Sequence, residues 1–255
     1  MTYKEILLSE DPVGTIRGLS RSGTLGKAYP ELEALKMPES KGRHKDNFEH
    51  SLKVLENAIS LEAGKVDLVL RTAALLHDVG KPDTRRFNGN KVTFIGHPEA
   101  GARIARKVLK NEYSKVEVNE ISLLIVLHMR GYGFAERDWS ESAFRRLMVD
   151  AGSEVQLARL IKIFRSDLTS ANPKLHHRVL EGIAKLEKGI IATKESDARA
   201  ARRPSINGND VMLLTGLSQG RDLGEVMRFL NKDEIIELPK EEAIERLKEA
   251  FPTLF

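Results

Sequence analysis

Three segments of the sequence each combine an apolar helix face with a metal-binding side chain at the end of that face. They are residues 66–77, 118–128 and 153–169. Apolar residues recur in them at the three- and four-residue spacing of one helix face, and the next position on that face is His77, His128 or Asp167. Burying such groups is unfavourable without a partner. The chain must therefore fold so that these helix ends meet solvent, hydrogen-bond partners or a cation.

The adjacent pair His77-Asp78 narrows this choice. Consecutive helical side chains diverge by about 100°, so both reach one ion only where that ion sits over a helix end. Gly80 and Pro82 follow directly, and such residues usually stop a helix. Either the pair is exposed at this end, or a positive group lies against it.

Helical periodicity runs through the rest of the chain and predicts an all-α fold. Further helices are expected at 46–61, 98–110, 141–151 and 174–194, with two or three short ones within 208–255. The low aromatic content, 5%, also favours helices over sheet. The turn Asn88-Gly89-Asn90 predicts a short hairpin or extended lid near 86–95.

The same pass along the chain predicts its domain organisation. A helical leader, 1–40, is expected to pack on a main helical domain, 41–195. Pro204 and the Asn-Gly-Asn run after it mark a linker, so a small helical appendage is expected at 205–255.

Composition excludes several classes of site. The chain has no cysteine, so disulfides, zinc–thiolate sites and cysteine nucleophiles are excluded, and a metal site must use His, Asp and Glu. No apolar run approaches the roughly 20 residues of a membrane span, and the first residues do not form a signal peptide. A cytoplasmic protein without membrane contact is therefore expected. The net charge of +4 favours anionic ligands only weakly.

Each polar candidate also has an ordinary structural reading. A single His50, His97 or His128 fits a core histidine bonded to a carbonyl, and Asp167 fits a helix cap. Lys81, Arg85 and Arg86 suit phosphate binding, but they also suit a solvated basic turn. His44 and Lys45 fit a basic loop better than a substrate contact, and His176 and His177 are expected to be surface or packing residues. Considered together, the candidates are more specific than any one of them.

Four stretches of the sequence carry a family resemblance: FEHSLKVLENA, AALLHDVGKPDTRR, FIGHPEAGARIARKVL and RSDLTSANP. They resemble the HD superfamily of metal-dependent phosphohydrolases over roughly residues 46–173. Segments on either side, LSEDPVGTIRGLSRSGTLGKAYPELEAL and INGNDVMLLTGLSQGRDLGEVM, are similar to those that flank the HD domain in bacterial CCA-adding enzymes and poly(A) polymerase-like tRNA nucleotidyltransferases. Nearly the whole chain thus resembles the C-terminal half of such an enzyme. The paired aspartates of the nucleotidyltransferase head have no counterpart, so this chain alone is not expected to add nucleotides.

The resemblance implies a ligand set. The HD pattern falls on His50, His77, Asp78 and Asp167, and His97 and His128 match the extra histidines of two-metal members. One or two divalent ions (Mn, Mg, Fe, Ni, Co or Zn) are implied, with Asp78 between them. Asp78 and Lys81 would act in catalysis, while Lys81, Arg85 and Arg86 would hold the substrate phosphate. Asp46 lies one helical turn before His50 and would orient it.

The implied function is hydrolysis of a phosphate ester by metal-activated hydroxide. The leading substrates are nucleotides or RNA 3′-end phosphates such as 2′,3′-cyclic phosphates, and a free (deoxy)nucleotide hydrolase is a second enzymatic possibility. The alternative from another class is a non-catalytic module that binds tRNA-like RNA or partners a separate nucleotidyltransferase. The substrate, the metal and the oligomeric state stay open at this point.

Overall fold

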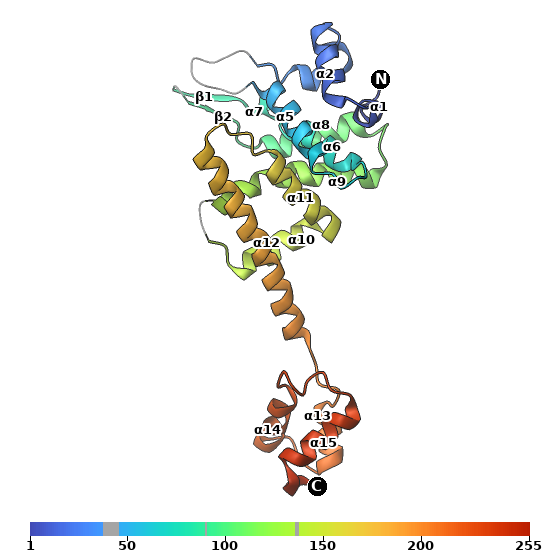
Figure 1. Cartoon of the computed structure of the whole chain (residues 1–255), viewed down its shortest axis with the longest axis vertical. Coiled ribbons are helices and arrows are strands. Elements are labelled where there is room, and N and C mark those ends of the chain that lie inside the picture. The colour runs from blue at the N-terminus through green and yellow to red at the C-terminus, as the bar shows by residue number, and fades with distance from the viewer. Residues whose placement is uncertain (38–45, 90, 136–137) are drawn as a thin grey trace. The chain divides into compact units, whose positions relative to one another are not determined.

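The chain folds almost entirely into helices, as the sequence predicts (Figure 1). The computed structural model describes residues 1–37, 46–89, 91–135 and 138–255, so His44 and Lys45 lie outside the described residues. Its helices are α1 (Tyr3–Leu8), α2 (Pro12–Arg21), α3 (Leu25–Ala28), α4 (Pro30–Glu33), α5 (Asn47–Ser60), α6 (Leu68–Leu76), α7 (Lys81–Thr84), α8 (His97–Leu109), α9 (Lys115–Leu127), α10 (Glu141–Ala151), α11 (Glu154–Ser166), α12 (Pro173–Ala201), α13 (Gly208–Thr215), α14 (Arg221–Leu230) and α15 (Lys240–Ala250), with the 3-10 helices η1 (His128–Ala135) and η2 (Pro252–Leu254).

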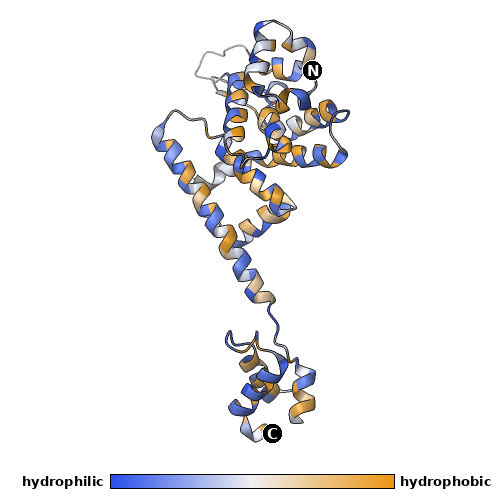
Figure 2. Ribbon diagram, turned by 45° about the vertical axis from the view of Figure 1, so that its right-hand side comes forward, coloured by the Kyte–Doolittle hydropathy of each residue, from blue (hydrophilic) through white to orange (hydrophobic). Residues whose placement is uncertain are grey.

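The described helices form two compact units, Met1–Ile190 and Ile191–Phe255. Each unit has its own apolar core, one drawn from Tyr3 to Ile190 and the other from Ile206 to Leu254. Apolar and polar residues alternate along the helices in the pattern of surface helices that cover a core (Figure 2). The division falls within α12, whereas the sequence suggests a linker around Pro204.

Helix α6 is the centre of the larger unit. All of its residues from Val69 to Leu76 are buried, so it needs neighbours on every side. It packs against α5, α9, α11 and α1. Through α1 the N-terminal leader joins the main core, where Tyr3, Ile6 and Leu7 are buried.

Capping residues set where the central helices begin. Asp67 accepts a hydrogen bond from the Leu70 amide, so α6 begins at Leu68 rather than at residue 66. A capping box between Ser114 and Glu117 begins α9 at Lys115, earlier than the expected residue 118.

The predicted hairpin is present and is the only sheet in the described part of the chain. Strand β1 (Arg86–Asn88) pairs antiparallel with β2 (Lys91–Thr93), with Phe87 opposite Val92. Gly89 in the turn has φ of 57°, a left-handed conformation that suits glycine and this type of turn. Among the described residues, no helix is long and apolar enough to span a membrane.

Candidate metal centre

Helix ends bring the predicted ligands together. His77, His128 and Asp167 are the C-cap residues of α6, α9 and α11. His97 is the first residue of α8, and His50 lies in the first turn of α5. Three helices therefore direct their C-termini, the negative ends of their dipoles, at one place, an arrangement that favours a cation.

Six side chains form this ligand cluster, in two sets. The first set is His50, His77 and Asp167, and the second is Asp78, His97 and His128. In the first set, His50 Nε2 lies 3.1 Å from Asp167 Oδ1 and 3.2 Å from His77 Nε2. In the second, His97 Nε2 lies 3.2 Å from His128 Nε2 and 3.4 Å from Asp78 Oδ1.

Asp78 links the two sets through its two carboxylate oxygens. Its Oδ2 lies 3.2 Å from His77 Nε2 and 3.4 Å from His50 Nε2. Its Oδ1 lies 3.4 Å from His97 Nε2 and 3.9 Å from His128 Nε2. Because one oxygen faces each set, Asp78 could contribute a ligand atom to an ion held by either set.

Backbone hydrogen bonds fix which ring nitrogen faces the cluster. The Nδ1 atoms of His77, His97 and His128 lie 2.6–2.8 Å from the carbonyl oxygens of Ala74, Phe94 and Ile125. A carbonyl can only accept, so each Nδ1 carries a proton. The Nε2 atoms are then the nitrogens available to bind a metal.

In the second set, the spacing of the two histidine nitrogens is explained better by a shared metal ion than by a hydrogen bond between them. Burial lowers the pKa of His97, and burial followed by the positive charge of His77 lowers that of His128 to about 4. Both rings are therefore neutral near pH 7, and their unprotonated Nε2 atoms lie 3.2 Å apart with no proton to share. Two nitrogens bound to one ion at about 2.1 Å lie roughly 3.0–3.4 Å apart. The residues present therefore fit a divalent cation.

The first set carries compensating charges. Burial disfavours the charged form of His77, but Asp78 and then Asp167 offset this and raise the pKa of His77 to about 9. Burial likewise opposes ionisation of both aspartates. Even so, the pKa of Asp78 lies well below its usual range because of His77 and Lys81, and the pKa of Asp167 is lowered by its hydrogen bond from His50 and by His77. Two carboxylates thus face two cations, His77 and Lys81.

Lys81 contacts the cluster directly, as one would require of a catalytic or phosphate-binding residue. Its Nζ lies 2.6 Å from Asp78 Oδ2 and 3.4 Å from Asn47 Oδ1. The ammonium also lies 5.6 Å from the centre of the Phe94 ring, within range of a cation–π contact. Asn47 and Phe94 are two site residues that sequence reasoning missed.

The structure gives Asp46 a different role from the one expected. Its carboxylate caps α5, accepting from the amides of Phe48 and Glu49 at 2.9 and 3.2 Å. The ring of His50 instead has Thr169 as its partner, with Nδ1 3.0 Å from the hydroxyl. The position of Thr169, two residues after Asp167 in a segment already singled out, was the available signal for it.

The remaining basic candidates lie on the hairpin or the surface. The Arg85 guanidinium lies 4.9 Å from the centre of the Phe87 ring, and Arg86 donates to the Arg85 carbonyl at 2.9 Å. His177 lies 3.2 Å from Glu181 on the exposed face of α12, and His176 is exposed as well.

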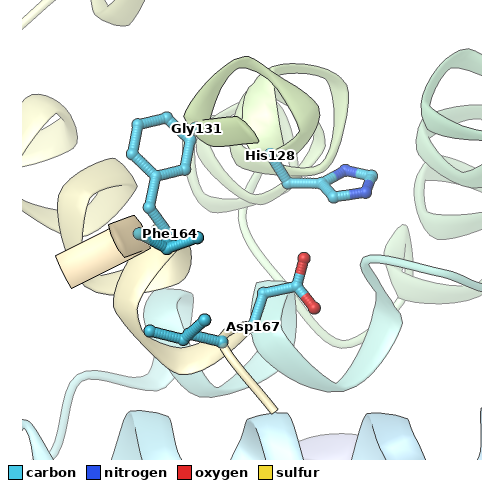
Figure 3. A pocket seen from close by; sticks show the side chains of 6 residues that line it. His128, Gly131, Phe164 and Asp167 are labelled. Carbon is cyan, nitrogen blue, oxygen red and sulfur yellow. The ribbon is translucent and has the colours of Figure 1, made fainter. Parts of the chain in front are cut away.

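A cavity of about 20 Å³, room for about one water molecule, adjoins the ligand cluster. It is lined by His128, Gly131, Phe164, Asp167, Leu168 and Val179. Figure 3 shows the His128 ring and the Asp167 carboxylate facing a common space, with Phe164 on its other side. A Cβ on Gly131 would lie 2.4 Å from the Phe164 ring, so only glycine fits here without movement. One side of the cluster is therefore apolar, which limits the access of water.

Known proteins resemble this chain in two ways. Residues 47–172 match the family model described as HD domain. The A-adding tRNA nucleotidyltransferase of Deinococcus radiodurans is 29% identical over 231 residues, covering 88% of this chain and 51% of that protein. The CC-adding tRNA nucleotidyltransferase of Thermus thermophilus is 31% identical over 229 residues, covering 88% and 49%. The multifunctional CCA protein of Halorhodospira halophila is 30% identical over 162 residues, covering 62% and 35%.

The chain spans about half the length of the first two of these relatives. The match to the family model contains the whole ligand cluster, from His50 to Asp167. Through residues 47–172, this chain belongs to the HD-domain family.

Proposed function

We propose that this chain is a divalent-metal-dependent phosphohydrolase that acts on nucleotides or RNA 3′-end phosphates, including 2′,3′-cyclic phosphates. The observation that carries the proposal is the convergence of four histidine Nε2 atoms and two carboxylates in two linked sets. A structural metal would need only one such set. Two sets that share Asp78 suit a reaction at a bridging position.

Each set would hold one ion, with Asp78 as the common ligand. When bound, such ions polarise a phosphoryl oxygen and make hydroxide available near neutral pH. The protein's part is to keep the four Nε2 atoms aimed inward through the Nδ1 hydrogen bonds, three to backbone carbonyls and that of His50 to Thr169, and to exclude water on the Phe164 side. The donor set does not distinguish Mn, Mg, Fe, Ni, Co and Zn.

Lys81 would bind the substrate phosphate. Its ammonium lies 2.6 Å from Asp78 Oδ2. Bound cations would share the Asp78 charge, so the ammonium could donate to a non-bridging phosphate oxygen while it stays beside the Phe94 ring and Asn47 Oδ1.

The test measures bound metal and the rate of phosphate-ester hydrolysis on the same protein preparation. Protein purified without added metal is analysed for bound metals and assayed on 2′,3′-cAMP, 2′-AMP, dNTPs and bis-p-nitrophenyl phosphate. Asp78→Ala removes the shared ligand, while Asp83→Ala changes an exposed aspartate on α7 and serves as the matched control. About two metals per chain and turnover that only Asp78→Ala abolishes would support the proposal. No bound metal and no turnover with any supplied ion would refute it.

A second candidate is a non-catalytic module that binds tRNA-like RNA or a separate nucleotidyltransferase. The observation that favours it is the extent of the similarity, which reaches well beyond residues 47–172 to cover 88% of the chain in two proteins named as tRNA nucleotidyltransferases. Tight tRNA binding that falls steeply with salt, without turnover of any phosphate ester, would favour this candidate.

A further inference from the structure

The hairpin is attached at both ends to the ligand cluster. Helix α7, which begins with Lys81, leads into β1, and β2 leads through Phe94 to His97. Phe94 contacts this region through two groups. Its carbonyl accepts a hydrogen bond from His97 Nδ1, and its ring lies against the Lys81 ammonium. From this root the two strands project from the body of the larger unit (Figure 1).

The projecting part of the hairpin displays an aromatic ring and positive charge. Phe87 is 66% exposed and Ile95 is 85% exposed, although large apolar side chains gain by burial. The Arg85 guanidinium lies over the Phe87 ring at 4.9 Å, and Arg86 beside it is exposed. Residues 81–97 include four basic residues and one acidic residue. This charge attracts anions, and an arginine-backed aromatic ring is a surface on which nucleobases stack.

Resting on the function proposed above, we infer that Phe87 and Arg86 bind a nucleotide upstream of the phosphate held at the ligand cluster, so that the substrate is an RNA end rather than a free mononucleotide. The two aromatic residues of the hairpin lie at different depths. Phe94, at the root, contacts Lys81 and serves the terminal nucleotide, whereas Phe87 lies further along the strand. On this assignment, the nucleotide whose phosphate is held at the cluster lies beside Phe94, and Phe87 contributes only to the binding of a longer strand.

Binding is tested with the whole chain and a 5′-fluorescein-labelled RNA hexamer that ends in a 3′-phosphorothioate, followed by anisotropy. Phe87→Ala is expected to weaken binding about tenfold, as loss of a stacking ring does. Phe87→Trp keeps an aromatic face and should retain affinity, whereas Phe87→Leu keeps only apolar area and should not. Val149→Ala, at a residue of α10 that is 77% exposed, is the matched control.

Steady-state kinetics distinguish an effect of Phe87 on substrate binding, seen in KM, from an effect on the reaction step, seen in kcat. For a hexamer ending in a 2′,3′-cyclic phosphate, Phe87→Ala should raise KM about tenfold with little change in kcat. The same variant should leave bis-p-nitrophenyl phosphate, which has no base, unaffected. Equal binding of the hexamer by wild type and Phe87→Ala would overturn the inference, as would an equal effect on 2′,3′-cAMP and the hexamer. Absence of turnover in the wild type would instead count against the hydrolase itself, and the anisotropy measurement would still decide the role of Phe87.

Discussion

The Nδ1 atoms of His77, His97 and His128 each donate to the carbonyl three residues earlier in the chain. For His77 and His128 those carbonyls belong to the last helical turn, where they have no partner within the helix. One hydrogen bond therefore satisfies a helix end and selects the tautomer of a ligand. A histidine placed directly after an apolar helix face can therefore make this hydrogen bond, which leaves its Nε2 atom free to bind a metal.

Asp46 should affect stability and leave metal content unchanged. Because its carboxylate accepts from two amides at the start of α5, Asp46→Ala should lower the free energy of unfolding by about 1 kcal/mol. Asp46→Asn retains an accepting oxygen and should change it by only a few tenths of a kcal/mol. Urea unfolding and metal analysis of both variants provide the check. A fall in metal content in Asp46→Asn would show that its charge acts on His50 after all.

At the scale of elements, close backbone contact joins the loop after α6 to α8. A Cβ on Gly80 would lie 2.1 Å from the His97 carbonyl oxygen and 2.4 Å from the Gly101 nitrogen. Since backbone atoms cannot move aside cheaply, only glycine allows this approach. The glycine thus fixes the distance between the helix that carries His77 and the helix that begins with His97.

Gly80→Ala should therefore destabilise the protein by about 3 kcal/mol and reduce metal binding, because His97 must shift. Gly18→Ala is the control, since a Cβ there meets nothing within 4 Å inside α2. That change should stabilise the protein by up to about 1 kcal/mol. Thermal unfolding and metal titration of both variants are the measurements. Similar behaviour of the two variants would contradict the close-contact explanation.

Ionisation of Tyr29, in the N-terminal leader, should lower the free energy of unfolding of the protein at high pH. Burial, then nearby carboxylates, raises the pKa of Tyr29 from 10.0 to about 12, and its hydroxyl donates to the Met1 carbonyl. A group with a raised pKa in the folded state contributes stability that is full below its unfolded pKa and is lost as pH rises through the folded value. Between pH 8 and pH 11, Tyr29 should account for a loss of about 1 kcal/mol.

Tyr29→Phe should remove that part of the pH dependence. Urea unfolding of wild type and variant at both pH values measures it. An identical fall in both proteins would show that Tyr29 ionises normally and that other groups, such as buried Tyr3 and Tyr113, carry the effect.

Sequence periodicity predicted the elements well and their contacts poorly. The stripes ending in His77, His128 and Asp167 located three helix ends, because amphipathic spacing and chain stop signals are local properties. The sequence did not show that Asp46 caps its helix while Thr169 meets His50, because that choice depends on how α5 packs against the segment after α11. The identity of the six ligands came from the family resemblance, whereas their division into two sets of three depends on tertiary packing.

At the scale of the whole molecule, the two units have separate cores and should unfold separately. Calorimetry of the full chain should show two transitions. All six ligands lie within Met1–Ile190, so adding Mn²⁺ should raise only the transition of the larger unit. At about 100 times the dissociation constant, the rise should be roughly 5–10 °C. Chelator should reverse it. A single transition that shifts as a whole would show that the units unfold together.

The meeting of three helix C-termini also dictates an order of events. In the cluster, His77 and Lys81 balance the charges of Asp78 and Asp167, and three helix C-termini add negative dipole ends. The protein groups alone therefore supply no net positive charge to bind a phosphate. Under the proposed function, divalent cations would have to bind before the substrate. Phosphate analogues should then compete with substrate only when divalent metal is present.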